Sequence, residues 1–162
     1  MAYSAEQALE RAVRMACQSP CQKSKRGVVI WNPELFDILC ANHNHPPRGF
    51  VCNGSEECRA NCGKHCVHAE MAAIIDAKTG LHRCHMLHVK VVDGEAVPSG
   101  PPSCADCSKH ILEAGIVTMW LLHEDGLRGY SAAEFHELSL AQRGLPVIRS
   151  WSASQRCCGS FQ

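Results

Sequence analysis

Apolar and polar positions alternate along this chain with two periods, one typical of helices and one typical of strands. Between residues 4 and 17 apolar side chains recur every three or four positions, which predicts an amphipathic helix with one buried face. Short β-branched runs such as Val28-Val29-Ile30 predict buried strands instead. The same criteria predict helices over residues 4–17, 67–78, 104–114 and 131–142, and strands over 27–31, 35–41, 86–92, 116–122 and 145–150.

The order of these elements predicts an α/β fold with helices packed against a sheet. The first two strands flank Asn32-Pro33-Glu34, a turn that favours an antiparallel hairpin. A helix separates the last two strands, 116–122 and 145–150, and such a connection predicts that they run parallel. The chain shows no repeat and no linker, so we expect one domain over residues 1–152 and a flexible tail over 153–162.

Three segments lack a clear period. Residues 42–49 and 93–102 are rich in proline and glycine, so both are predicted loops. Residues 50–66 are polar and rich in cysteine, and the pattern assigns them no element. Ser131, with Glu134 three positions later, predicts the N-terminal cap of the last helix.

Composition indicates a globular protein without a general affinity for nucleic acid. Of the 162 residues 46% are hydrophobic and 20% are charged, and 16 Lys and Arg residues balance 16 Asp and Glu residues. A chain without net charge has no overall attraction to a phosphate polymer, although these numbers leave room for a local basic patch. No apolar run is long enough to span a membrane, and the start of the chain lacks the pattern of a secretory signal. We therefore expect a cytoplasmic protein with no membrane partner.

The 12 cysteines and 10 histidines leave two interpretations open. A small secreted protein would use its cysteines in disulfides, whereas an intracellular protein keeps them reduced and uses some as metal ligands. The lack of a secretory pattern favours reduced cysteines.

One pair of motifs predicts a specific chemistry. His68-Ala69-Glu70 is followed by Cys104-Ala105-Asp106-Cys107, which is nearly the H-x-E and P-C-x-x-C signature of zinc-dependent nucleobase deaminases. One histidine and two cysteines are good zinc ligands, and three protein ligands leave a fourth position for water. Both motifs fall at predicted helix starts, where the partial positive charge favours the thiolate form of the two cysteines.

Glu70 is placed to act as a proton shuttle rather than as a ligand. A carboxylate beside a zinc-bound water can take its proton and then serve the ring nitrogen and the departing amine of an amidine. The alternative is a structural zinc, with Glu70 as a surface charge. Structural sites normally close with four protein ligands, so three ligands and a well-spaced glutamate favour deamination.

Beyond these motifs, residues 5–150 resemble the zinc-dependent cytidine and deoxycytidylate deaminase superfamily in the order of their elements. The similarity is greatest to the deoxycytidylate (dCMP) deaminase branch. Three features carry it: Ser19-Pro20-Cys21 followed by residues 26–30, the loop 42–49, which resembles a Gly-Tyr-Asn-Gly-x-Pro-x-Gly segment, and the helix between the last two strands. The resemblance implies a three-layer α/β/α fold with a five-stranded mixed sheet, homo-oligomers and pyrimidine nucleotides as substrates.

The resemblance also implies roles for single residues. It makes His68 and the two motif cysteines zinc ligands, makes Glu70 the proton shuttle and places Asn44 against the substrate sugar. We expect Ala69 at the substrate as well. Arg48 is our candidate phosphate contact, because a guanidinium group suits phosphate geometry.

Five positions depart from the pattern of the superfamily. Ser103 replaces the proline before the first motif cysteine, and Ala72 replaces an asparagine in the helix. In the loop, Asn42, His43 and His45 replace Gly, Tyr and Gly. These positions surround the expected pocket and spare the metal ligands, so they bear on the choice of substrate.

A second metal site is predicted around residues 50–66. Some dCMP deaminases carry a structural zinc that uses one cysteine near position 21 and another near position 52, so the resemblance implies a second zinc here. Buried free thiols are the alternative. The candidate ligands, among which the sequence does not choose, are Cys21, Cys52, Cys58, Cys62, His65 and Cys66.

Together these expectations favour a zinc enzyme that deaminates a small pyrimidine nucleotide or nucleoside, dCMP first. Two alternatives keep the same chemistry but change the substrate, to cytosine in single-stranded DNA or RNA, or to a purine or another heterocycle. A polynucleotide deaminase needs a basic groove and aromatic platforms, whereas this chain is 6% aromatic and has no net charge. A non-enzymatic zinc module is a further alternative, against which Glu70 argues.

Overall fold

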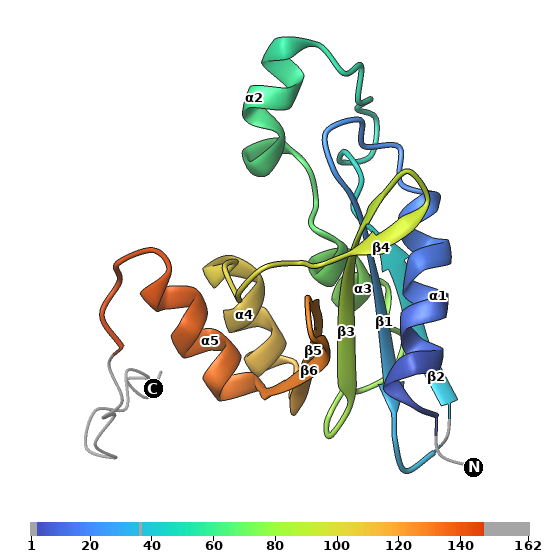
Figure 1. The fold of residues 1–162 in the computed structure, drawn as a ribbon, viewed down its shortest axis with the longest axis vertical. Helices are drawn as coiled ribbons and strands as arrows, with labels where there is room; N and C mark the ends of the chain where they lie inside the picture. Colours follow the sequence, from blue (N-terminus) through green and yellow to red (C-terminus); the bar gives the residue numbers. More distant parts are fainter. Residues whose placement is uncertain (1–2, 36, 148–162) are drawn as a thin grey trace, which may run out of the picture.

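The computed structural model describes residues 3–35 and 37–147, which form alternating helices and strands (Figure 1). The strands are β1 (Lys25–Asn32), β2 (Asp37–His43), β3 (His85–Val92), β4 (Glu95–Val97), β5 (Thr118–His123) and β6 (Gly126–Ser131). The helices are α1 (Ala5–Cys17), α2 (Glu56–His65), α3 (Ala69–Asp76), α4 (Ala105–Glu113) and α5 (Ala132–Ala141).

The strands form one mixed sheet in the order β2-β1-β3-β5-β6, and β4 pairs with β3 in a short hairpin. The pair β3–β5 is parallel, and the other pairs are antiparallel. A parallel pair needs a crossover, and the connection between β3 and β5 contains α4. This crossover brings the start of α4 to the same end of the sheet as the start of α3.

Helix α1 covers one face of the sheet. Its buried stripe consists of small residues, Ala8, Ala12 and Ala16, none of which is accessible to solvent. It packs against the side chains of β1 and β3 that point to this face, Val29 among them. Gly27 permits the close approach, because a Cβ at this position would lie 2.1 Å from the carbonyl oxygen of Ala12.

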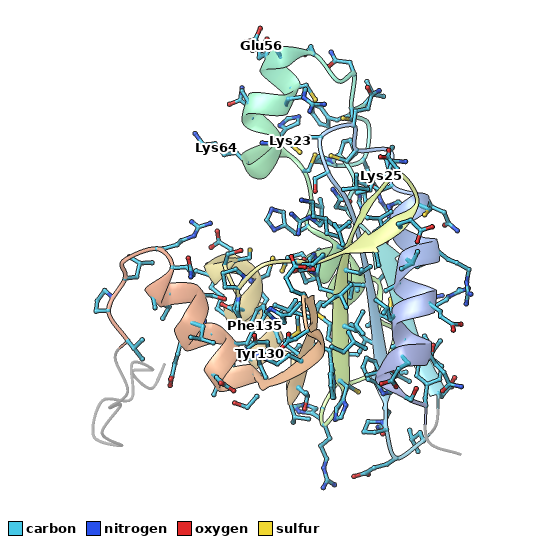
Figure 2. All side chains as sticks on the ribbon, in the orientation of Figure 1. Lys23, Lys25, Glu56, Lys64, Tyr130 and Phe135 are labelled. Atoms are coloured by element: carbon cyan, nitrogen blue, oxygen red, sulfur yellow. The ribbon has the colours of Figure 1, made fainter. Side chains whose placement is uncertain are left out.

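The other face of the sheet carries α3, α4 and α5. Side chains alternate along β1, so Val28 and Ile30 point to this face and join the larger of the two buried clusters. Tyr130 and Phe135 close the cluster beside α5, with ring centroids 6.4 Å apart (Figure 2). The molecule therefore has three layers, with α1 on one side of the sheet and α4 and α5 on the other (Figure 1).

Helix α2 occupies the cysteine-rich segment to which the sequence pattern assigned no element. Glu56 begins it and Lys64 lies in its last turn, an arrangement of charges that suits the helix dipole (Figure 2). Cys62 is the one buried residue of this helix. Helix α2 lies beyond the end of the sheet rather than against one of its faces (Figure 1).

The predicted α/β class, the three layers and the mixed sheet are confirmed, and the cap at Ser131 is present, since its side chain accepts a hydrogen bond from the Glu134 N–H. The sheet has six strands rather than five. Strand β4 lies in the predicted loop 93–102, and β6 lies mostly in residues 123–130, to which the sequence pattern assigned no element.

The prediction of two parallel strands at the end of the sheet is wrong for the described part of the chain. Its last two strands, β5 and β6, form an antiparallel hairpin. The reason is a tight turn at Glu124-Asp125, after which β6 begins at Gly126 with φ 116°, a conformation that favours glycine. Residues 145–147 are not in a strand, and residues 148–150 lie outside the described residues. The expected tail over 153–162 also lies outside them.

Within residues 3–35 and 37–147, none of the helices has the length and apolar character that crossing a bilayer would demand.

Candidate active site

Three metal-ligating side chains converge where α3 and α4 begin. His68 Nδ1 lies 3.3 Å from Cys104 Sγ and 3.2 Å from Cys107 Sγ, and the two sulfurs are 2.8 Å apart. Bonds from zinc to sulfur and nitrogen are about 2.3 and 2.0–2.1 Å long, so atoms at these separations can share one ion. The structure therefore brings the three predicted ligands together, and their donor set of one imidazole and two thiols fits zinc.

Local structure explains this convergence. His68 is the N-cap residue of α3 and Cys104 that of α4, so both helices begin at the site. Cys104 Sγ accepts a hydrogen bond of 3.2 Å from the Cys107 N–H. The thiol of Cys107, and then His68, lower the pKa of Cys104 to about 5, whereas the interaction with Cys104 raises the pKa of Cys107. A thiolate at a helix start is the form that binds a metal ion.

Glu70 lies in the first turn of α3 and is 7% exposed. Burial opposes its ionisation, but the electrostatic effects of His88, of a backbone hydrogen bond and of His68 and Arg26 outweigh burial and lower the pKa of Glu70. The ring of His88, on β3, is equally buried, and its Nε2 lies 4.0 Å from Glu70 Oε1, too far for a hydrogen bond. The site thus holds a carboxylate beside the metal ligands.

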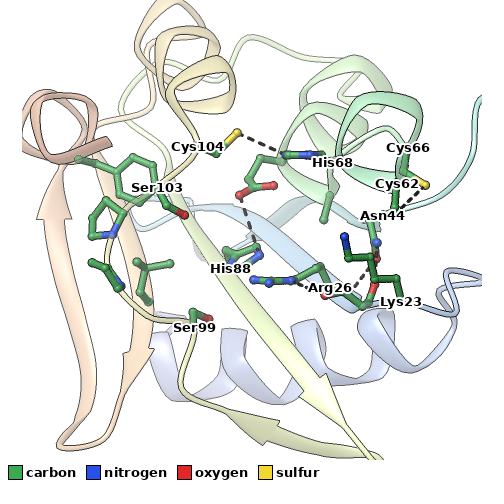
Figure 3. A pocket seen from close by; sticks show the side chains of 18 residues that line it. Lys23, Arg26, Asn44, Cys62, Cys66, His68, His88, Ser99, Ser103 and Cys104 are labelled. Atoms are coloured by element: carbon green, nitrogen blue, oxygen red, sulfur yellow. Dashed lines mark hydrogen bonds and ion pairs between the residues drawn. The ribbon is translucent and has the colours of Figure 1, made fainter. Parts of the chain in front are cut away.

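A cavity of about 230 Å³ opens beside these residues (Figure 3). It is small compared with the roughly 300–1,000 Å³ of pockets for drug-sized ligands, so it suits a small ligand. Glu70 is the one carboxylate among the described residues that line it. The polar residues of the lining are Lys23, Ser24, Arg26, Asn44, His68, Glu70, His88, Ser99 and Ser103.

Asn44 lines the cavity, but most of its side chain is committed to the protein. Its Oδ1 accepts hydrogen bonds from the Arg26 N–H and the Ser19 hydroxyl, both 2.8 Å long. Its Nδ2 donates to the carbonyl oxygen of Ser24, also at 2.8 Å. An amide group offers four hydrogen-bonding positions, so one N–H of Asn44 is left for a ligand. Asn44 therefore also holds the segment 24–26 in place.

The other predicted substrate residues are placed differently. Ala69 is buried and lines the cavity, whereas Arg48 is exposed and lies outside the lining. Among the positions that depart from the superfamily pattern, Ser103 lines the cavity and Ala72 is buried outside its lining.

Sequence reasoning missed several residues of this lining. Lys23 and Arg26 precede or begin a strand and look like ordinary surface charges, and His88 and Ser99 carry no motif. One weak signal was available, because His88 is a polar residue in the otherwise apolar run Met86–Val89 of β3.

A second group of ligating atoms lies between the start of β1 and α2. Cys21 Sγ is 3.5 Å from Cys62 Sγ, which is 3.4 Å from Cys66 Sγ, and the three sulfurs lie within 4.8 Å of one another. We call Cys21, Cys62 and Cys66 the α2 thiol cluster. Two of its members, Cys62 and Cys66, also line the cavity beside Glu70.

The other candidates for a second metal site lie near this cluster but outside it. Cys52 and Cys58 form a pair with sulfurs 3.7 Å apart. The ring of His65 packs edge to face against Phe50, with centroids 5.3 Å apart. Of the six candidate ligands, the structure therefore brings three together, Cys21, Cys62 and Cys66.

A three-layer fold with a histidine and a C-x-x-C motif at two helix starts is the architecture of the cytidine deaminase fold class, and comparison with solved structures confirms this fold. The chain is similar to the dCMP deaminase of the cyanophage S-TIM5 in its apo form, with 21% identity, a TM-score of 0.52 and coverage of 70% of this chain and 78% of that one. For the same phage enzyme in complex with dCMP and dUMP, the identity is 23% and the TM-score 0.55, and the match covers 70% of this chain and 76% of that one. For the cytidine deaminase of Burkholderia pseudomallei, the identity is 14% and the TM-score 0.57, and the match covers 82% of this chain and 96% of that one.

No protein-family model and no curated protein matches the sequence. The similarity to these solved structures is therefore a similarity of fold.

Proposed function

We propose that the protein is a zinc-dependent deaminase of a small pyrimidine nucleotide, with dCMP as its first substrate. One observation carries the proposal. His68, Cys104 and Cys107 meet within 4.8 Å, and the buried carboxylate of Glu70 lines the same small cavity. A structural zinc site requires neither a buried glutamate nor a cavity.

The residues divide the work as follows. A zinc ion held by His68, Cys104 and Cys107 would supply Lewis acidity and a water of lowered pKa. Glu70 accepts the proton of the attacking water and delivers it to the ring nitrogen next to the reacting carbon. Glu70 then takes the proton of the hydroxyl group now bonded to the reacting carbon and transfers it to the amine. The C–N bond breaks, ammonia leaves, and the ring keeps a carbonyl group in place of the amine.

Two features support a nucleotide substrate. Among the described residues, two Lys or Arg side chains line the cavity, Lys23 and Arg26, against one carboxylate, that of Glu70. This balance of charge favours an anionic ligand. Lys23 is exposed at the rim, so we infer that it contacts the phosphate, a role for which Arg48 remains a second candidate. The phage enzyme with the same fold was solved in complex with dCMP and dUMP.

We also propose that the α2 thiol cluster holds a second, structural zinc, with Cys52 or Cys58 as a further ligand. Three thiols of a reduced protein within 4.8 Å of one another fit a zinc site that lacks one ligand.

The test of the function is ammonia release by zinc-loaded protein across cytosine, deoxycytidine, dCMP, dCTP, dAMP and a cytosine-containing single-stranded oligonucleotide. We expect the highest kcat/KM for dCMP, with formation of dUMP. Cys107→Ser, which removes a metal ligand, is the matched inactive control. Release of ammonia from none of these compounds by protein with a full complement of zinc would contradict the proposal.

A further inference from the structure

Three side chains of the cavity have hydrogen-bonding groups that no described residue satisfies. The ring of His88 makes no hydrogen bond, and its nearest charged neighbour is the Glu70 oxygen at 4.0 Å. The hydroxyl of Ser99 is buried without a partner. Arg26 donates through Nε to Ser24 Oγ at 2.8 Å, whereas its two terminal nitrogens make no hydrogen bond and no ion pair within the described residues.

These groups interrupt an apolar face. Arg26 lies on the same face of β1 as Val28, and His88 on the same face of β3 as Met86, and both neighbours belong to the buried core. Val28 is the register partner of His88, so Arg26 and His88 are diagonal neighbours on adjacent strands. Figure 3 shows the guanidinium end of Arg26 extending toward His88. The buried hydroxyl of Ser99 has no partner, which is costly, and Arg26 and His88 present further unpaired groups to the same cavity. This arrangement points to a ligand that completes them.

The position of these groups identifies the part of the ligand. His68 and Cys104 mark the end of the cavity where the amine must be replaced, and His88 and Arg26 lie together on another side of it (Figure 3). Glu70 must reach the ring nitrogen next to the reacting carbon. In cytosine the next ring atom bears a carbonyl oxygen, an acceptor, whereas in adenine it bears only hydrogen.

We propose that Arg26, supported by His88 and Ser99, donates hydrogen bonds to this ring carbonyl and thereby selects an oxopyrimidine over a purine. The inference rests on the proposed function for the orientation of the base. Arg26 is the specificity-determining residue. The terminal nitrogens of its guanidinium group have no acceptor among the described residues, and bound adenine, which has no carbonyl oxygen at this position, would leave them unpaired. A site that is built to hydrogen-bond a substrate group discriminates strongly against a ligand that lacks it.

Binding to a catalytically silent protein tests this inference separately from turnover. In zinc-loaded Glu70→Gln protein, calorimetry measures the Kd of dCMP and of its 2-thio analogue, in which sulfur, a weak acceptor, replaces the ring oxygen. The same pair is measured without phosphate, as deoxycytidine and 2-thiodeoxycytidine. Each measurement is repeated with Arg26→Met and with Lys25→Met. Lys25 is the adjacent cation on β1 and lies outside the cavity lining, so it controls for the loss of one charge.

We expect the Glu70→Gln protein to prefer oxygen over sulfur by on the order of 10- to 100-fold, the range for a hydrogen bond to a charged group. Arg26→Met should reduce this preference to within about threefold, with and without phosphate, while Lys25→Met leaves it unchanged. A preference that Arg26→Met leaves intact would overturn the inference. So would an effect of Arg26→Met that is confined to the phosphorylated pair, because Arg26 would then be a phosphate contact.

The failure of the proposed function gives a different result. If wild-type protein deaminates no compound but binds dCMP more tightly than its 2-thio analogue, in a manner that depends on Arg26, this result supports the inference and contradicts the proposed function. If the protein binds none of the four ligands, both the inference and the proposed function are contradicted. Thermal melting of Arg26→Met confirms that the variant is folded.

Discussion

At the scale of single residues, Glu70 carries the proposed chemistry. The change Glu70→Gln keeps the volume and the buried position of the side chain but removes its ability to carry protons. We expect kcat for dCMP to fall by roughly 10²–10⁴-fold, the usual contribution of a general acid–base group. Zinc content, measured by atomic absorption, should equal that of the wild type. Turnover within a few-fold of the wild type would show that Glu70 has no such role.

Asn44 has a structural role, and we expect it to contact the substrate as well. Asn44→Ala leaves the Arg26 N–H without its acceptor and the Ser24 carbonyl oxygen without its donor, and a buried group that loses its partner costs about 1–3 kcal/mol. We expect a lower free energy of unfolding in urea and a higher KM for dCMP. Asn42→Ala is the control, because Asn42 is less buried and bonds to the carboxylate of Asp76. Equal stability of the two variants would contradict the role of Asn44 in holding the segment 24–26.

The residues of this site differ in how well the sequence predicts them. His68 and Glu70 are two positions apart, and Cys104 and Cys107 are three apart, so local spacing alone identifies them. His88 and Ser99 enter the same cavity only through the register of β1 with β3 and the path of the loop before α4. No local pattern encodes such long-range neighbours. Arg48 shows the opposite case, because it is only four positions after Asn44 in the sequence but does not line the cavity.

At the scale of elements, the contact between α1 and β1 depends on the absence of a side chain at Gly27. A methyl group there would lie 2.1 Å from the carbonyl oxygen of Ala12 and 2.7 Å from the amide nitrogen of Ala16, so the helix backbone would have to move. Overpacking typically costs about 1–3 kcal/mol, and more when backbone must shift. We expect Gly27→Ala to lower the melting temperature clearly, whereas Gly63→Ala, on α2 with open space around it, should not. Calorimetric melting of both variants decides the matter.

Helix α2 has little apolar surface, so a metal ion is the natural means of fixing it. Cys62→Ser should reduce the zinc content from about two ions per chain to about one. It should also make α2 more sensitive to proteolysis, because a structural zinc contributes directly to folding. Cys17→Ser is the control, since Cys17 is exposed and outside the thiol cluster. A content of one zinc in both the wild type and Cys62→Ser would favour the alternative of buried free thiols.

The elements were predictable where the apolar period is long. The helices α1, α3, α4 and α5 and the strands β1, β2, β3 and β5 follow from it. Strand β6 was not predicted, because only Leu127 and Tyr130 of its six residues are large and apolar. Helix α2 was not predicted either, because Cys62 is its one buried residue and the helix therefore has no apolar stripe.

At the scale of the whole molecule, charge and cavity size separate a nucleotide from a polynucleotide. The chain has no net charge, and the described lining of the cavity has only two Lys or Arg side chains, Lys23 and Arg26, with Phe135 as its one aromatic side chain besides histidine. Binding of single-stranded DNA usually combines a basic groove with several aromatic platforms. A single flipped base could enter the cavity, but little on the surface would hold the strand on either side of it.

We therefore expect weak binding of single-stranded DNA. In fluorescence anisotropy at about 150 mM salt, a labelled cytosine-containing 20-mer should show no saturation with micromolar Glu70→Gln protein, a variant that cannot consume its ligand. The same preparation should bind dCMP saturably in calorimetry, which serves as the control for a competent site. Saturable submicromolar binding of the oligonucleotide, with an affinity that falls steeply as salt increases, would reveal several phosphate contacts. The substrate would then be a polynucleotide, and the roles of His68, Glu70, Cys104 and Cys107 would remain as they are.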